Sequence, residues 1–203
     1  MIEHLLKVRR AFVRARCLIL KRFGLVVLLG LSVAACTLAP SANVRALPMD
    51  ASEMLYAHNK VRAKVGLPPL QWSSELAHYA QNWAYILATR NRCRMSHRSA
   101  KGQNAKGYGE NIYWASPTRW RDGRVEIQTI SASKVAYDWA SEREVYHYPS
   151  NRCQPGEQCG HYTQMVWRDT QKVGCGAALC PDKGQMWVCN YDPPGNWRGE
   201  WPY

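Results

Sequence analysis

Cysteines are the residues of this sequence with the widest choice of chemistry. Of the eight, two lie near the N-terminus, and the other six are Cys93, Cys153, Cys159, Cys175, Cys180 and Cys189. Structural zinc sites are usually built from Cys-x-x-Cys pairs, and the sequence contains none. An even number of cysteines in an exported chain indicates disulfides instead, although six cysteines allow fifteen pairings. We therefore expect three disulfides, with their pairing open.

A glutamate in an apolar stripe is the second unusual feature. Residues 131–144 have a helical pattern in which Val135, Trp139 and Glu142 fall at i, i+4 and i+7, on one face. Charged side chains seldom lie on a buried face unless they are paired. Glu142 therefore either has a function or lies only at the edge of the stripe.

Residues 1–35 predict an export signal rather than part of the fold. Seven Lys and Arg side chains precede an uncharged run from Phe23 to Ala35 that is rich in Leu, Val, Ala and Gly. This run is shorter than the roughly 20 apolar residues that a membrane-spanning helix needs. Its basic flank and small final residues are typical of a signal peptide. An uncleaved membrane anchor is the alternative.

The end of the apolar run resembles a bacterial lipobox. Three small residues, 33–35, precede Cys36, which would be acylated and become the mature N-terminus. Two acyl chains already hold a protein stably on a membrane. Thr37 stands where an aspartate would signal retention at the inner membrane. Ordinary cleavage further on, after Ala46, is the alternative.

These signals divide the chain into an export signal at 1–35, a tether at 36–50 and one domain at 51–203. We expect a secreted or cell-envelope protein, anchored to the outer membrane through lipidated Cys36.

The formal net charge is +12. The leader holds seven of the 27 basic and one of the 15 acidic side chains, which leaves +6. This excess favours anionic surfaces such as lipid head groups. No nucleic-acid-binding pattern is present, so we expect no nucleic-acid partner. We also expect a monomer.

Hydrophobic periodicity and turn signals predict a mixed domain. The expected helices are 53–65, 73–90 and 131–144. The expected strands are 111–114, 172–179 and 186–191. The segments expected to be loops are 98–109 and 149–160, and the polar segment 119–124 is expected to be a surface excursion. Helices around a few strands indicate an α+β domain.

Several motifs in order resemble the CAP superfamily (cysteine-rich secretory proteins, antigen five, pathogenesis-related protein one), and most closely its plant pathogenesis-related members. They are His58-Asn59-Lys60-Val61-Arg62, Gly109-Glu110-Asn111-Ile112-Tyr113, the run GHYTQMVWR from Gly160 and the run CNYDPPGNW from Cys189. Trp139 and Glu142 also match the family's Trp-x-x-Glu helix. The resemblance covers residues 52–203, and the set is specific although each motif alone is weak.

The resemblance implies an α+β fold of the three-layer α-β-α sandwich type, with a short antiparallel sheet. It also implies three disulfide pairs, Cys93–Cys180, Cys153–Cys159 and Cys175–Cys189. In plant relatives the peptide after the Cys-Asn-Tyr motif is released as a defence signal. The tail at 193–203 resembles that peptide, and it is either released likewise or packed on the sheet as structure.

A cleft of two histidines and two glutamates is also implied by the resemblance, and its members here are His97, Glu110, Glu142 and His161. Two neutral imidazoles can hold a divalent ion such as zinc, oriented by nearby carboxylates. The same groups can act as general acid and base, because His titrates near neutral pH. Alternatively, two His–Glu pairs only tie loops together. His58 is a weaker candidate, expected to stabilise its helix.

We expect a binding protein rather than an enzyme, with no required cofactor. The cysteines are expected to be oxidised, no His-Glu-x-x-His motif exists, and Ser96 and Thr163 would point away from the cleft histidines on a strand. Some family members bind sterols or fatty acids, and Trp120 is the most exposed candidate for contact with such a ligand or a membrane. The alternatives are a hydrolase or peptidase that uses the cleft, and an envelope protein without a small ligand.

Overall fold

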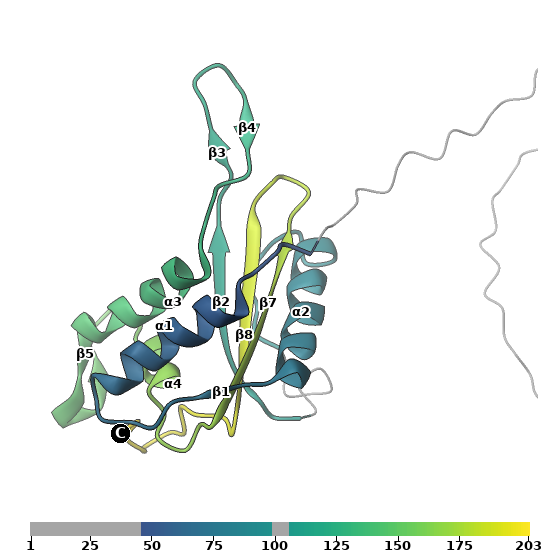
Figure 1. Cartoon of the computed structure of the whole chain (residues 1–203). Coiled ribbons are helices and arrows are strands. Elements are labelled where there is room, and N and C mark those ends of the chain that lie inside the picture. Colours follow the sequence, from purple (N-terminus) through teal and green to yellow (C-terminus); the bar gives the residue numbers. More distant parts are fainter. Residues whose placement is uncertain (1–45, 99–105) are drawn as a thin grey trace, which may run out of the picture. The chain divides into compact units, whose positions relative to one another are not determined.

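The computed structural model describes residues 46–98 and 106–203 (Figure 1). Cys36, the export signal and most of the tether lie outside the described residues. A four-stranded sheet has the order β1-β7-β8-β2. Its strands are β1 (Gln71–Trp72), β7 (Lys172–Leu179), β8 (Gln185–Asp192) and β2 (Gly109–Ala115). β1 pairs parallel with β7, and the other two pairings are antiparallel.

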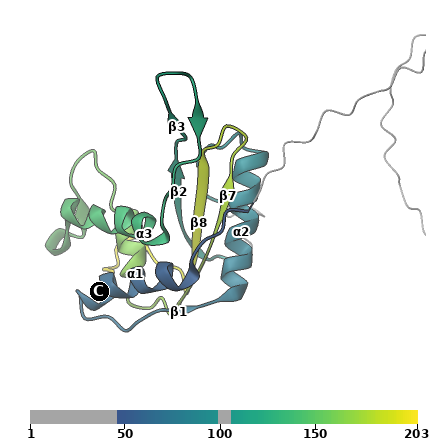
Figure 2. The same cartoon turned by 45° about the horizontal axis from the view of Figure 1, so that its top comes forward.

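Helices cover both faces of this sheet, so the α-β-α sandwich of an α+β domain is confirmed (Figures 1 and 2). One face packs on α2 (Ser74–Thr89). The other packs on α1 (Ala51–Ala63), α3 (Ala132–Ser141) and α4 (Gly160–Met165). Successive side chains of a strand point to opposite faces, which explains the two cores. Cys175 and Ala177 face α1, α3 and α4, whereas Gly174 and Gly176 face α2.

The small residues of β7 let α2 lie close to the sheet. A Cβ at Gly174 would come within 2.2 Å of the Ala77 backbone nitrogen, and one at Gly176 within 2.5 Å of the Gln81 Cα. The Gln81 side chain exchanges two hydrogen bonds with the backbone of Ala177, at 2.9 and 3.1 Å. Gln81 of α2 thus supplies hydrogen-bond partners to the backbone of β7 beyond the point where the two-residue strand β1 ends.

The three disulfides join the pairs that the family resemblance implies. Cys175–Cys189 links β7 to β8, Cys153–Cys159 closes a short loop, and Cys93–Cys180 ties the segment after α2 to the end of β7. Such bridges are typical of domains in an oxidising, extracytoplasmic compartment. In the described ranges, no helix combines the length and apolarity that crossing a membrane requires.

The His58–Arg62 motif of α1 builds the core. His58 is fully buried, with Nδ1 2.8 Å from the Met54 carbonyl oxygen and Nε2 2.9 Å from the Tyr191 hydroxyl. Arg62 is also fully buried and donates to four backbone carbonyls, those of Pro68, Met165, Trp167 and Thr170. Its guanidinium therefore fastens α1 to the segment that follows α4.

The structure differs from the predicted elements in three main respects. The helix expected to end at residue 144 ends at Ser141, followed by the 3-10 turn η1 (Glu142–Val145). Segment 149–160 is not wholly irregular, because it contains part of η2 (Tyr148–Ser150) and β6 (Arg152–Cys153), which pairs with β5 (Tyr146–His147). The third difference is α4, which was not predicted. Segment 119–124 is a surface excursion as expected, and it belongs to a hairpin of β3 (Thr118–Arg119) and β4 (Val125–Glu126).

Candidate functional site

Four separate segments bring the predicted cleft residues together. His97 follows α2, Glu110 is the second residue of β2, Glu142 caps the end of α3, and His161 lies in the first turn of α4. A pocket of about 140 Å³ is lined by both histidines and Glu110, together with Asn111, Gln158, Gly160 and Asn196. Glu142 lies behind His161 and does not line this pocket.

His97 and Glu110 form the first pair of the cleft. The Nδ1 atom of His97 lies 2.9 Å from Oε1 of Glu110, which also accepts a 3.1 Å hydrogen bond from the backbone N–H of Arg98. The Glu110 side chain is 6% exposed and that of His97 is 65% exposed. The hydrogen bond to Glu110 raises the pKa of His97. Oε2 of Glu110 is buried and has no hydrogen-bond partner among the described residues.

His161 and Glu142 form the second pair. Nδ1 of His161 lies 2.5 Å from Oε1 of Glu142. Oε2 of Glu142 accepts hydrogen bonds from the backbone N–H groups of His161 and Tyr162, at 2.9 and 3.1 Å. A carboxylate at a helix N-terminus satisfies N–H groups that have no partner within the helix. Glu142 therefore orients the histidine and caps α4 at the same time.

A buried polar chain supports His161 from behind. The side-chain NH₂ of Asn111 donates to the carbonyl of His161 at 3.1 Å and to the hydroxyl of Tyr191 at 3.0 Å. That hydroxyl also contacts His58, whose pKa burial lowers to about 4. The ring of Trp139 stacks on His161 with centroids 6.0 Å apart and planes 22° apart. These contacts fix the imidazole in one orientation.

In both pairs Nε2 is the ring nitrogen that does not face the glutamate, so it is the atom that can bind a metal or accept a proton. Because each Nδ1 faces a carboxylate, it carries the proton of the neutral ring, and Nε2 is left as an acceptor. A carboxylate at Nδ1 is the usual arrangement behind a metal-binding histidine. The same arrangement suits a general base. The cleft is therefore built for either metal binding or proton transfer.

No activated nucleophile accompanies these histidines in the described chain. The expectation that Thr163 lies on a strand is wrong, because it lies on α4 and donates to Asn196 Oδ1 at 2.7 Å. The Ser96 hydroxyl contacts the carbonyl of His97 rather than its ring. All six cysteines in the part of the chain that the structure describes are in disulfides. Covalent catalysis by Ser, Thr or Cys thus has no support in this geometry.

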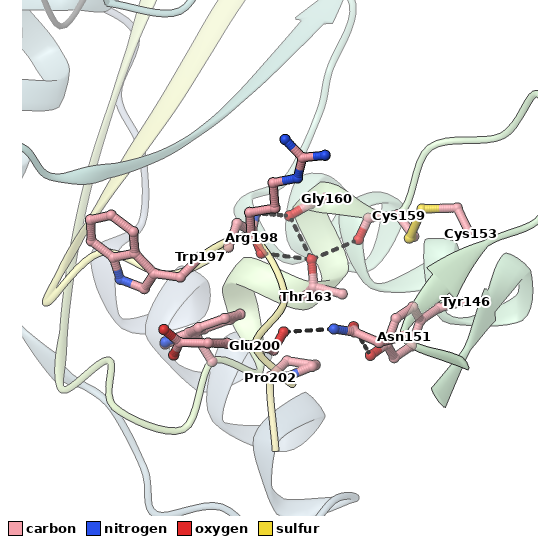
Figure 3. Close-up of a pocket in the computed structure, with 13 residues that line it drawn as sticks. Tyr146, Asn151, Cys153, Cys159, Gly160, Thr163, Trp197, Arg198, Glu200 and Pro202 are labelled. Carbon is pink, nitrogen blue, oxygen red and sulfur yellow. Dashed lines mark hydrogen bonds between the residues drawn. A yellow bond between two sulfur atoms is a disulfide. The ribbon is translucent and has the colours of Figure 1, made fainter. Parts of the chain in front are cut away.

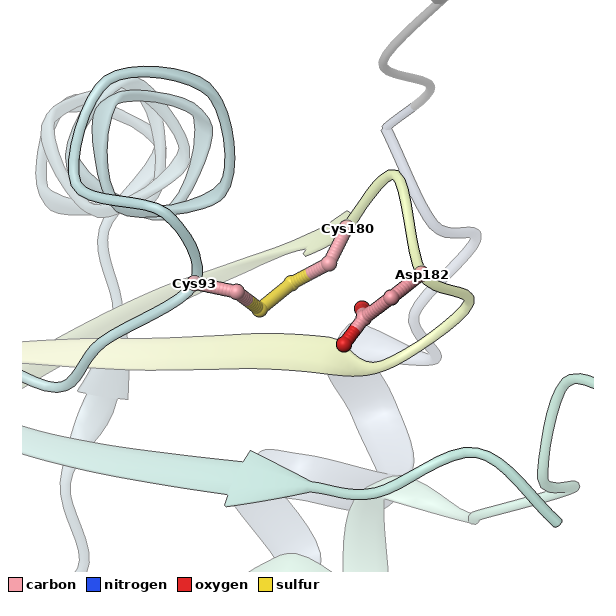
Figure 4. A group of neighbouring side chains, drawn as sticks. All are labelled: Cys93, Cys180 and Asp182. Atoms are coloured by element: carbon pink, nitrogen blue, oxygen red, sulfur yellow. A yellow bond between two sulfur atoms is a disulfide. The ribbon is translucent and has the colours of Figure 1, made fainter. Parts of the chain in front are cut away.

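A second cluster of metal-ligand residue types does not fit a metal. Among the described residues, Cys93, Cys180 and Asp182 bring one ligand atom each within 4.8 Å of the others (Figure 4). The two sulfurs, however, are bonded to each other. Zinc binds the cysteine thiolate, which a disulfide does not offer. We therefore assign no metal to this cluster.

The C-terminal tail closes a second pocket beside the cleft, of about 300 Å³ (Figure 3). It shares Gly160 and Asn196 with the cleft. The tail is held by hydrogen bonds to its backbone carbonyls, from the Arg168 N–H to Pro202 at 2.6 Å and from the Asn151 amide to Glu200 at 2.7 Å. It thus packs beside α4 and the β5–β6 segment rather than on the sheet.

Sequence reasoning missed three polar residues of the cleft, Asn111, Gln158 and Asn196. Asn111 and Asn196 stand inside motifs that were singled out, next to Glu110 and after the Pro-Pro-Gly run. Trp120 is 48% exposed, but Trp197 is 57% exposed, so the expectation that Trp120 is the most exposed candidate is wrong.

Comparison with known proteins agrees with this geometry. The family described as CAP, the cysteine-rich secretory protein family, matches residues 55–191. The chain belongs to the CAP family. It is 45% identical to pathogenesis-related protein PR-1 of Medicago truncatula, over 75% of this chain and 78% of that protein.

Solved CAP structures share the fold. Venom allergen-like protein 4 of Schistosoma mansoni is 27% identical and superimposes with a TM-score of 0.54, covering 75% of this chain and 92% of that one. NaASP2, solved with Zn²⁺, is 26% identical with a TM-score of 0.55, covering 76% of this chain and 86% of that one.

Proposed function

We propose that this CAP protein is an exported binding protein whose His/Glu cleft holds a divalent cation, zinc in particular. The observation that carries the proposal is that His97 and His161 line one pocket while each directs Nδ1 at a glutamate. The Nε2 atoms are then the metal ligands, and water completes the coordination shell.

The donor set suits zinc. Imidazole nitrogen and carboxylate oxygen are both ordinary zinc ligands. The unpaired Oε2 of Glu110 is a buried acceptor that water bound to the cation would satisfy. The likeness to NaASP2, which was solved with Zn²⁺, supports the same assignment.

Binding is favoured over hydrolysis by the absence of an activated nucleophile from the described cleft. Catalytic zinc sites usually have three protein ligands and an open position. Two histidines with water hold a metal more weakly, which suits exchange with a ligand or partner. The hydrolase alternative would need the cation to activate water, with Glu110 as general base.

A crevice between α1 and α3 supports a second candidate function, the binding of an acyl chain. It is lined by Val61, Val65, Tyr137, Ala140 and Tyr162, with the cations Lys64 and Arg143 at its edge, and its volume is about 60 Å³. So small a space admits part of an acyl chain but no sterol ring system. Mass spectrometry of lipid extracted from the protein, with Ala140→Phe to fill the crevice, tests this function.

Export and membrane anchoring belong to the same proposal. The three disulfides and the leader support an extracytoplasmic location. Labelling with radioactive palmitate tests acylation of Cys36, with Cys36→Ser as control. Label that is incorporated equally into both proteins would rule out the lipobox.

Calorimetric titration with zinc chloride, after removal of metal with EDTA, tests the cleft. We expect one zinc per chain and loss of that site in His97→Ala/His161→Ala. The matched control is His78→Ala/His147→Ala, which removes two exposed histidines outside the pocket. Equal zinc binding by the two double variants would refute the assignment.

A further inference from the structure

We infer that the end of the sheet that carries the β3–β4 hairpin is a surface that binds anionic membranes. This hairpin end consists of the turn at 90–94, the hairpin at 118–127 and the β7–β8 turn at 181–184. In both views the hairpin projects beyond the sheet (Figures 1 and 2). The inference rests on the export to the cell envelope proposed above, and not on the metal site.

Specific contacts join the three segments into one surface. The last residue of β2, Ala115, pairs with Gln185 directly after the β7–β8 turn. From that turn Lys183 Nζ donates to the carbonyl of Val125 at 2.6 Å. The disulfide Cys93–Cys180 brings the segment after α2 to the same place (Figure 4). The hairpin is therefore fastened to the sheet end and presents a fixed set of side chains.

Positive charge dominates this hairpin end. Its basic residues, all exposed, are Arg90, Arg92, Arg94, Arg119, Arg121, Arg124 and Lys183, against three acidic ones, Asp122, Glu126 and Asp182. Arg124 pairs with both carboxylates of the hairpin, at 2.6 and 3.2 Å. Neither Arg119 nor Arg121 has an acidic partner within the described ranges. Their charges are available to the phosphates of anionic lipids.

Exposed apolar side chains accompany the charges. Trp114 is 41% exposed, Trp120 48% and Ile127 47%. The indole N–H of Trp120 donates to Glu126, and the Arg124 guanidinium lies 5.3 Å from the centroid of its ring. Trp with Arg or Lys is the combination that collects at the membrane–water interface, where one part of each side chain is apolar and the other is wet.

The place where the chain enters the domain favours a membrane, rather than another macromolecule, as the partner of this surface. Ala46 pairs with Ala178 near the end of β7, so the chain enters the domain close to the hairpin end. Ala46 follows Cys36 by ten positions, and ten extended residues span at most about 35 Å. A chain acylated at Cys36 would therefore keep this end within about that distance of the bilayer. The His/Glu cleft lies at the opposite end of β2, near Glu110.

Vesicle sedimentation in EDTA tests the surface on the exported chain carrying Cys36→Ser, so that neither an acyl chain nor a metal contributes. We expect binding to vesicles of phosphatidylglycerol and phosphatidylcholine but not to phosphatidylcholine alone. Arg119→Gln/Arg121→Gln should weaken the binding about thirty-fold, because each basic side chain near an anionic surface contributes about fivefold. Trp120→Ser should weaken it further.

Matched controls lie at the other end of the domain. Arg152→Gln/Arg198→Gln removes the same charge, and Trp197→Ser removes an exposed indole. Wild-type binding by both controls, with loss in the hairpin variants, supports the inference. Equal loss in the control and hairpin variants, or no binding to either kind of vesicle, overturns it. The substituted Arg and Trp residues are all exposed, and thermal unfolding checks that each variant is folded.

Discussion

Glu142 contacts His161 twice, through side chain and backbone. One carboxylate oxygen lies 2.5 Å from the ring Nδ1 and the other 2.9 Å from the backbone nitrogen. The residue that orients the histidine is therefore also the residue that begins its helix. A change of Glu142 should therefore alter both the orientation of His161 in the cleft and the stability of α4.

Glu142→Gln should weaken zinc binding about 10-fold to 100-fold, the usual effect of removing a carboxylate behind a metal-binding histidine. It should also lower the free energy of unfolding by about 1 kcal/mol, because one charged helix cap is lost. Zinc titration and urea unfolding measure the two effects. Glu144→Gln, a change to an exposed neighbour, is the control and should alter neither.

His58 should make the domain sensitive to acid. Burial lowers its folded-state pKa to about 4, from 6.5. The unfolded chain therefore binds more protons between these values, and stability is lost as the pH falls from about 6.5 towards 4. The difference of 2.5 pKa units corresponds to about 3 kcal/mol.

Urea unfolding at pH 7 and at pH 4.5 measures this loss. His58→Gln should be less stable at pH 7 but should depend less on pH, because the titrating group is absent. An unchanged pH slope in His58→Gln would assign the acid sensitivity to other groups.

Arg62→Lys should destabilise the domain by at least about 3 kcal/mol. The guanidinium reaches four carbonyls at 2.8 to 3.1 Å, and a lysine ammonium has three donors at one point. At least one of the four carbonyl groups would then stay buried without a hydrogen-bond donor. Thermal unfolding against Arg152→Lys, an exposed substitution of the same kind, measures the difference; equal melting temperatures would contradict this role.

Gly176→Ala should lower the free energy of unfolding by about 1 to 3 kcal/mol, because the added methyl group would clash with the backbone of α2. Gly160→Ala is the control, since its nearest atom is 3.8 Å away. Unfolding by denaturant compares the two. If Gly176→Ala were as stable as Gly160→Ala, the close packing of α2 on β7 would be wrong.

Much of the fold could be predicted from local signals. Ser73 caps α2 and Ser131 caps α3, and each precedes an apolar stripe of helical period. Two runs separated by a Gly-containing turn likewise predicted β7 and β8 as strands. The disulfide pairing came from the family resemblance, because spacing alone left fifteen possibilities.

The short helix α4 could not be predicted in this way. It spans six residues and has no side-chain cap of its own. Its cap is Glu142, which stands 19 residues away in the sequence. For the same reason the position of Glu142 on the stripe of Trp139 was ambiguous, since its partner is visible only in three dimensions. Asn196 reaches the cleft through the fold of the tail, which no periodicity describes.

The most direct test of the metal-binding cleft is the NMR signal of the histidine ring nitrogens during zinc titration of ¹⁵N-labelled protein. Before zinc, His97 and His161 should both carry the neutral-ring proton on Nδ1. On addition of zinc the Nε2 resonances of these two residues should shift together and saturate at one equivalent. Shifts confined to His78 or His147, or none at all, would contradict the proposal that this cleft binds the metal.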